Sequence, residues 1–413
     1  MRDRKLYAQI LGIQSPWKVK DVELKLEGGE VRVTVVHAAA ASLRCPCCGK
    51  SAPGYDTRRR HWRHLDTCQY RTILQADVPR VECAEHGVKQ ITVPWAETGS
   101  GFTALFERVV IDWLKETSMA AVARQLSMTW DEVDGIMSRA VRRGLARREF
   151  EPAPRMGVDE TSFQKRHEYV TIVSDLDTSE VLHVADNRKV ESLNGYFEQL
   201  SDHQLEQIEV VAMDMWAPYL NSVRHYVPQA DDKIVFDRFH VAKHLGDAVD
   251  RVRRAENKQL RADGDDRLKG SRYLWLENPT TMSTERWRGE FEALRRSNLR
   301  TARAWAIKET AARLWNYRTR GWARRGWKRW LGWAKRSRLE PIKKAASMIE
   351  RHLGGIINAV VYQASNAGAE SINARIQRVK RMACGYRNRD RFRNAIYFHL
   401  GGLALYPFTH TDS

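Results

Sequence analysis

The sequence predicts a multi-domain α/β protein, and three observations lead to that prediction. The chain has 413 residues, which at roughly one domain per 150 residues is too long for a single small core. All but one of its 6 cysteines crowd between residues 45 and 83. Strand-like alternation after residue 154 gives way to a helical pattern from about residue 244 to residue 362. We therefore expect a cysteine-rich N-terminal domain, an α/β core and a helical domain inserted into that core.

The N-terminal segment predicts a β-hairpin that leads into the cysteines. Residues 22–26 and 31–35 alternate apolar and polar side chains on either side of Gly28 and Gly29. Such alternation around a glycine turn is typical of two antiparallel strands. We place the hairpin and the cysteines together in an N-terminal domain, residues 1–100.

Two short motifs in this domain predict a zinc site. Each offers two ligand side chains separated by two residues, and each is followed by glycine. Structural zinc takes four Cys or His ligands, so two such motifs suffice to close a site. The ligand set that the spacing favours is Cys45, Cys48, Cys83 and His86. Four nearby residues could replace a member of this set: Cys47, Cys68, His61 and His64.

A basic run with one tryptophan lies between the two motifs, at residues 58–65. Arginine forks onto phosphate oxygens, so this run beside a zinc fold favours contact with a DNA backbone. A solvated surface is the other interpretation of the same run. The candidate DNA contacts here are Arg58, Arg59, Arg60 and Arg63.

Residues 101–150 predict a small helical DNA-binding unit. Apolar residues recur three or four apart from residue 105 to residue 141, with a break at residues 127–129 and Thr129 placed as a helix N-cap. The pattern resembles a helix-turn-helix, although an ordinary helical hairpin would give the same spacing. The candidate DNA contacts on the second helix are Arg139, Arg142 and Arg143.

The segment after the prolines at residues 152 and 154 predicts the α/β core. Strands are expected at residues 155–161, 168–174, 181–185, 208–214 and 233–236, and helices at residues 190–200 and 217–227. This order, β-β-β-α-β-α-β, is that of a ribonuclease-H-like core. We expect its first part at residues 155–243, the all-α insertion at residues 244–362, and its final part with a basic tail at residues 363–413.

Three carboxylates occupy the places where this fold would hold two divalent metal ions: Asp159, Asp214 and Glu370. The first two end apolar strands, and the third lies on a late helix. Strand alternation puts Asp159 and Glu160 on opposite faces, and we favour Asp159 as the ligand. Each carboxylate alone could be a simple surface residue, but together in a basic chain they predict a metal site.

Further polar residues accompany these carboxylates. Asp237 and His240 follow the last strand, where they could support the site or could only fill a domain interface. Ile372, Ile376 and Val379 form an apolar stripe on the late helix, and Glu370 shares another stripe with polar groups suited to phosphate contact. The candidate DNA contacts in this region are Asn373, Arg378, Arg381 and Arg387.

The charge balance favours nucleic acid as the partner. Lys and Arg total 69 against 51 for Asp and Glu, which gives a net charge of +18. An anionic membrane is the weaker alternative, because no run of about 18 apolar residues and no apolar leader is present. We therefore expect a cytoplasmic protein that binds double-stranded DNA and no membrane.

Nearly the whole chain resembles the bacterial insertion-sequence transposases of the ISL-three family, a branch of the DDE transposases. The resemblance is carried by residues 45–49, 63–66, 83–87, 157–160, 237–240, 365–373 and 385–388. It implies an N-terminal zinc-binding domain, a helix-turn-helix domain and a catalytic core with an α-helical insertion. It also implies the acidic triad Asp159, Asp214 and Glu370 and the zinc ligands given above.

The expected activity is cleavage and joining of DNA at the terminal inverted repeats of an insertion sequence. A dimer would bind the repeats, with Mg²⁺ or Mn²⁺ at the triad and Zn²⁺ at the cysteines. A structure-selective nuclease of the same fold would cleave without joining. A silent DNA-binding regulator derived from a transposase would have no use for three convergent carboxylates.

Overall fold

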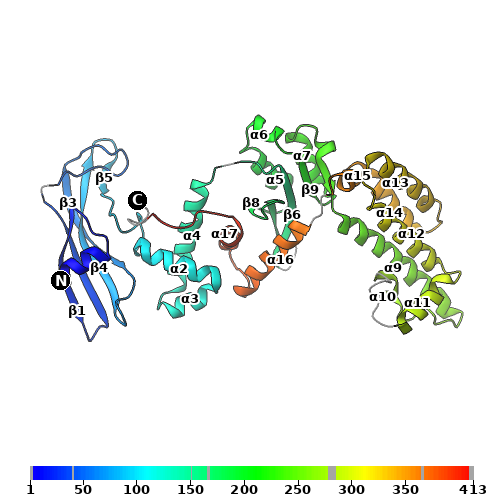
Figure 1. Cartoon of the computed structure of the whole chain (residues 1–413), viewed down its shortest axis with the longest axis horizontal. Coiled ribbons are helices and arrows are strands. Elements are labelled where there is room, and N and C mark those ends of the chain that lie inside the picture. The colour runs from blue at the N-terminus through cyan, green and yellow to red at the C-terminus, as the bar shows by residue number, and fades with distance from the viewer. Residues whose placement is uncertain are drawn as a thin grey trace.

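The computed structural model describes residues 3–39, 41–149, 151–164, 168–277, 285–363 and 367–408, and of residues 286, 287, 367, 369 and 370 it describes the backbone alone. Figure 1 shows the parts in a row along the long axis: an N-terminal sheet, three helices, an α/β layer structure and a helical bundle. Within the described residues, no helix combines the length and the apolar character needed to cross a membrane.

The N-terminal part is a five-stranded sheet beside one short helix. The predicted hairpin is confirmed, since β1 and β2 pair antiparallel with Lys25 opposite Glu30. The strand order is β1-β2-β4-β3, with β5 on β4. Its core includes three tryptophans in edge-to-face contact, Trp17, Trp95 and Trp62. The elements are α1 (Asp3–Ile10), β1 (Trp17–Lys25), β2 (Glu30–His37), β3 (Gly54–Arg63), β4 (Arg71–Cys83) and β5 (Gly87–Gln90).

Three helices follow, as the spacing predicts: α2 (Ala104–Glu116), α3 (Met119–Gln125) and α4 (Trp130–Arg147). Thr129 is the N-cap of α4, and it forms a capping box with Glu132. The buried faces of these helices do not form a separate core. They share one cluster with strands β7 (Glu168–Asp175) and β8 (Val181–Asp186) and with helices α16 (Ala367–Met382) and α17 (Arg389–Leu400).

The second sheet has the order β10-β9-β6-β7-β8. Strands β6, β7 and β8 pair antiparallel, whereas β9 pairs parallel with β6, and β10 pairs parallel with β9. All five expected strands are confirmed. Their bounds are β6 (Arg155–Gln164), β7 (Glu168–Asp175), β8 (Val181–Asp186), β9 (Val210–Met213) and β10 (Ile234–Phe236).

Helices cover both faces of this sheet. One core cluster joins β6 and β9 to the helices that connect the strands, and the cluster around α16 and α17 lies on the other side. Ile372, Ile376 and Val379 of α16 are buried, as their spacing predicts. The connecting helices are α5 (Val190–Phe197), α6 (Asp202–Glu206), α7 (Ala217–Tyr226) and α8 (Ala230–Lys233).

The segment expected to form the helical insertion consists of helices within its described residues, but its first helix begins earlier than the sequence suggested. Helix α9 runs unbroken from Arg238 to Ala262, so the expected boundary at residues 243 and 244 falls inside it. Helix α15 packs on β10, where a Cβ at Gly355 would lie 2.5 Å from the ring of Phe236. The helices are α9 (Arg238–Ala262), α10 (Arg272–Leu276), α11 (Glu285–Arg296), α12 (Arg300–Leu314), α13 (Arg320–Lys335), α14 (Glu340–Arg351) and α15 (Leu353–Tyr362).

Candidate active site and zinc centre

Two of the three predicted carboxylates emerge side by side from neighbouring strands. Strands β6 and β9 run parallel, and their last paired residues are Val158 and Met213. Asp159 is the next residue on β6, which continues to Gln164, and Asp214 directly follows the end of β9. Both residues therefore lie at the carboxyl end of β9, and α/β proteins place their ligands at the carboxyl ends of parallel strands. The register therefore places these two residues at the same level of neighbouring strands.

Asp159 is held by contacts from two directions. Its Oδ1 accepts the backbone N–H of Glu160 at 2.7 Å, and its Oδ2 accepts the side-chain amide of Asn373 on α16 at 2.5 Å. Burial raises the pKa of Asp159 to about 6 against the opposing effect of these hydrogen bonds. Because burial disfavours the charged form of this carboxylate, a bound cation would stabilise it. Asn373, expected as a DNA contact, is placed on this carboxylate instead.

Asp214 is paired with a histidine from the first turn of α9. His240 Nδ1 lies 2.9 Å from Asp214 Oδ1, and His240 Nε2 lies 3.8 Å from Asp237 Oδ2. Burial raises the pKa of Asp214, but the hydrogen bond and charge of His240 outweigh it, so the pKa is lowered. The bond with Asp214 in turn raises the pKa of His240. Asp237 also caps α9 by accepting the N–H of Phe239 at 2.9 Å.

Glu160 faces a different partner, as strand alternation predicts. Its Oε1 lies 3.2 Å from Arg188 Nη1. The Arg188 guanidinium also lies 4.6 Å from the ring centre of Tyr169 and 4.8 Å from that of Trp216. Sequence reasoning missed this cluster, because Arg188 stands alone after β8 and no motif marks it. Helix α16 carries the third predicted carboxylate, Glu370, but the side chain of Glu370 lies outside the described residues.

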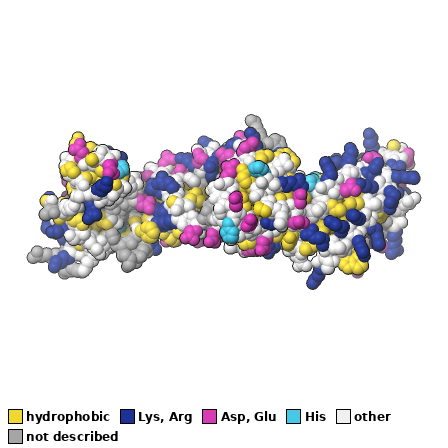
Figure 2. Space-filling model, turned by 90° about the horizontal axis from the view of Figure 1, so that it is seen from above, with side chains coloured by type: hydrophobic (Ala, Val, Ile, Leu, Met, Phe, Trp, Pro, Cys, Tyr) yellow, Lys and Arg dark blue, Asp and Glu magenta, His cyan; other side chains and the backbone are white. Residues whose placement is uncertain are grey.

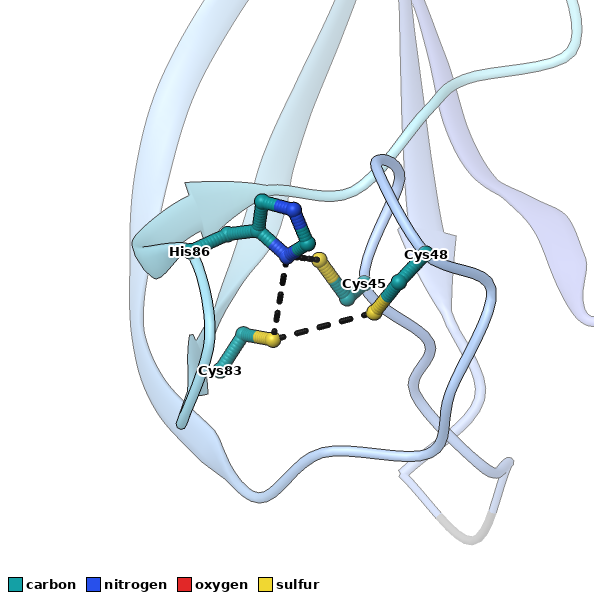
Figure 3. Close-up of side chains that lie close together, drawn as sticks. All are labelled: Cys45, Cys48, Cys83 and His86. Carbon is teal, nitrogen blue, oxygen red and sulfur yellow. Dashed lines mark hydrogen bonds between the residues drawn. The ribbon is translucent and has the colours of Figure 1, made fainter.

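The second candidate site gathers the predicted zinc ligands (Figure 3). The ligand atoms of Cys45, Cys48, Cys83 and His86 all lie within 4.8 Å of one another. Cys48 Sγ is 3.8 Å from Cys83 Sγ, and His86 Nδ1 is 3.6 Å from Cys83 Sγ. Backbone hydrogen bonds, chiefly around Cys48, lower the pKa of Cys45 to about 6. Thiolate and imidazole ligands at this spacing are the donor set that structural zinc takes.

The local backbone explains the turn that each of the two motifs forms. Gly49 and Gly87 follow the two motifs with φ of +70° and +66°, a conformation that favours glycine. The first turn is closed by the Gly49 N–H, which donates to Cys45 O at 2.9 Å. The four alternative ligands all lie outside this cluster in the described structure: Cys47, Cys68, His61 and His64.

The basic run of the N-terminal domain forms β3, and its arginines differ in availability. Arg58 is exposed, and Arg60 lies 5.9 Å from the ring centre of Trp62. Arg59 pairs with Asp77 through two contacts of 2.9 and 3.0 Å. Arg63 is largely buried, pairs with Asp66 and packs on the ring of Phe106, so it joins the sheet to α2. A structural role for Arg63 replaces the expected DNA contact.

The three arginines of α4 that were expected to contact DNA also differ in exposure and pairing. Arg143 is buried and reaches Glu97 and Glu107, with Nη2 distances of 2.8 and 3.1 Å. Arg139 Nη2 lies 2.6 Å from Glu107 Oε1, which is 1% exposed. The charges of both arginines are therefore satisfied inside the fold, which corrects the expectation for them. Arg142 is exposed, as are three candidates nearer α16 and α17: Arg378, Arg381 and Arg387.

Three family models match this chain. Residues 156–396 match a family model described as "Transposase" of the ISL3 type, residues 91–141 match "Helix-turn-helix domain of transposase family ISL3", and residues 42–86 match "zinc-finger of transposase IS204/IS1001/IS1096/IS1165". The zinc-finger match and the Cys/His cluster together support bound Zn²⁺.

Two curated relatives are similar over almost their whole length. The transposase for insertion sequence element IS1001 from Bordetella parapertussis is 28% identical over 98% of this chain and 99% of its own. The transposase for insertion sequence element IS1557 from Mycobacterium tuberculosis is 28% identical over 94% of this chain and 93% of its own. The chain belongs to the ISL3 family of insertion-sequence transposases, DDE enzymes that cut and join DNA.

Proposed function

We propose that this transposase binds the terminal inverted repeats of its insertion sequence and performs two-metal phosphoryl transfer with Asp159, Asp214 and Glu370. The observation that carries the proposal is the pairing of β6 with β9, which aligns the first two carboxylates. Position 370 precedes Asn373 by one helical turn on α16, and Asn373 already reaches Asp159. The third carboxylate thus belongs to a helix that is docked on the first.

The proposal includes a ribonuclease-H-like catalytic core. Three antiparallel strands followed by two parallel ones, with helices on both faces, support it. We propose five domains, residues 1–100, 101–150, 155–237, 238–362 and 363–413. The boundary expected at residues 243 and 244 moves to residue 238, where α9 begins.

The residues of the core fit divalent metal ions. Carboxylate oxygens are the donors that Mg²⁺ and Mn²⁺ prefer, and burial makes an unaccompanied charge on Asp159 costly. Two bound ions supply activation of the attacking water or 3′-hydroxyl and stabilisation of the leaving oxygen. The protein orients the carboxylates: Asn373 and the Glu160 N–H fix Asp159, and His240 fixes Asp214.

The remaining parts would position DNA. Zn²⁺ held by Cys45, Cys48, Cys83 and His86 would fix the N-terminal sheet. Five exposed arginines and the half-buried Arg60 would contact phosphates near the repeats and near the catalytic site; the exposed ones are Arg58, Arg142, Arg378, Arg381 and Arg387. We further propose a dimer that holds the two ends of the element, and a cytoplasmic location on chromosomal DNA.

The test is cleavage and strand transfer of labelled DNA that carries the element's own ends, with Mg²⁺ present. Asp159→Asn, Asp214→Asn and Glu370→Gln should each abolish both steps while binding to the ends persists. Asp177→Asn is the control, because Asp177 lies in an exposed turn and pairs with Arg155. Activity that survives in any of the three variants would refute the site, and cleavage without joining would indicate a nuclease.

A further inference from the structure

The most one-sided charge distribution in the helical bundle belongs to α13. The helix holds six cations and no acidic residue: Arg320, Arg324, Arg325, Lys328, Arg329 and Lys335. Arg336 and Arg338 follow directly. Figure 2 shows Lys and Arg gathered over the end of the molecule that the bundle forms. Like charges this close repel one another, so the helix is arranged to meet an anionic partner.

The two faces of α13 are sharply divided. Ala323, Trp327, Trp330, Leu331 and Ala334 are buried and pack into the bundle. The opposite face carries Arg325, Lys328, Arg329 and Arg336, all exposed. The Arg325 guanidinium lies 5.5 Å from the ring centre of Trp322, which is 61% exposed. The cations are therefore presented outward by a face whose reverse side fixes the helix.

Most of these cations lack a carboxylate partner within the described part of the chain. Lys335 pairs with Glu350, and Arg320 lies 4.0 Å from Asp232. Arg324, Arg325, Lys328, Arg329 and Arg336 form no such pair with a described residue. Helix α11 shows the usual alternative, because Arg295 and Arg296 both pair with Glu292 there. The charge on α13 is available for an external ligand.

We propose that this face of α13, defined by Arg325, Lys328, Arg329 and Arg336, binds the phosphate backbone of the duplex that flanks the insertion sequence. The inference rests on the proposed function. In Figure 1 the catalytic sheet lies between the zinc and helix-turn-helix parts on one side and the bundle on the other. A terminal repeat held by the first parts and cleaved at the sheet continues beyond the cleavage point toward the bundle. The flanking DNA is therefore the duplex nearest α13.

The dimensions of the helix suit a duplex backbone. At 16 residues and about 1.5 Å per residue, α13 is about 24 Å long. That length covers about seven base pairs, since base pairs rise about 3.4 Å each along the helix axis. Contacts to phosphate carry no base information, so the face should bind flanks of any sequence equally.

The experiment measures binding of the full-length protein to labelled duplexes that carry the element's end. One duplex stops at the cleavage position, a second adds a flank, and a third adds the same flank length with a different sequence. The test variant is Arg325→Gln, Lys328→Gln and Arg329→Gln combined. The matched control is Arg254→Gln, Arg295→Gln and Arg296→Gln combined, which removes three bundle cations that already have carboxylate partners.

Wild type and control should bind both flanked duplexes more tightly than the unflanked one. The test variant should lose this extra affinity and keep its affinity for the unflanked duplex. Each phosphate contact contributes about 0.9 to the slope of log affinity against log salt, so the slope on flanked DNA should fall by about 2.7. Between about 50 and 200 mM salt, the affinity of the test variant for flanked DNA should therefore fall about 40-fold less than that of the wild type.

Other outcomes would overturn the inference. If the test variant still bound flanked DNA more tightly than unflanked DNA, α13 would be excluded as the source of that difference. If the control variant lost the difference equally, the difference would be due to net charge. A test variant that binds flanked ends normally but fails only in joining to target DNA would assign the face to the target duplex instead. Failure of the wild type to bind any end would refute the proposed function itself, a result distinguishable from all of these.

Discussion

Arg143 was expected to contact DNA, but its contacts give it a structural role that a substitution can test. Its side chain is 7% exposed, and it joins α4 to Glu97 before α2 and to Glu107 within α2. It also donates to the backbone carbonyl of Leu405. Breaking a buried ion pair by removing one partner costs about 3–5 kcal/mol, because the remaining charge stays buried. Glu107 keeps Arg139, so Arg143→Met should lie near the lower end, at about 3 kcal/mol.

The assay compares Arg143→Met with Arg142→Gln, its exposed neighbour on the same helix. Hydrogen exchange of the full-length protein should show protection of α4 falling by about a hundredfold in the first variant, since about 1.4 kcal/mol corresponds to tenfold. The second variant should leave protection unchanged and lower the salt dependence of DNA binding. If Arg143→Met kept full protection and lost salt-dependent binding instead, the structural assignment would be refuted.

Three further predictions concern separate parts of the chain. Burial lowers the pKa of His64 to about 4 from an ordinary value of 6.5, so its share of stability is complete above pH 6.5 and declines as the pH falls toward 4. Between pH 7 and 5 this loss should reach about 2 kcal/mol by hydrogen exchange of β3 and β4, and His64→Gln should remove it. Cys83→Ser should release the zinc, measured by elemental analysis, whereas the exposed Cys47→Ser should retain it, and equal metal content would contradict the ligand set. Asn373→Ala should lower cleavage or raise the Mg²⁺ requirement by about 10- to 100-fold with DNA binding intact, while Gln377→Ala, which loses only a contact with a threonine, should not.

The sequence was informative wherever a local pattern determines the structure. Strand alternation located all five strands of the core, and the two carboxylates followed because each directly succeeds an apolar run. The pairs Cys45–Cys48 and Cys83–His86 each sit in a short turn whose shape depends on the adjacent glycine, so each pair is recognisable locally. Recognising a turn or a strand requires no knowledge of contacts between distant parts of the chain.

Features that depend on distant partners could not be predicted. The sequence does not distinguish an arginine that faces phosphate from one that faces a buried carboxylate. Arg143 pairs with Glu107, which lies on another helix. Asn373 was assigned to DNA for the same reason, since its contact with Asp159 spans 214 positions. The early start of α9 was missed because neither glycine nor proline marks residues 238–243 as distinct from the helix beyond.

Helix α9 connects the chemistry of the core to the position of the bundle. Asp237, directly after β10, is its N-cap, and its first turn carries His240, which contacts Asp214. With 25 residues at about 1.5 Å each it extends about 37 Å, and it packs against α12 and α14. The same helix therefore contacts Asp214, a carboxylate of the proposed site, and packs in the bundle that presents α13. DNA bound on α13, as we propose, would therefore be held at a distance from Asp214 that α9 sets.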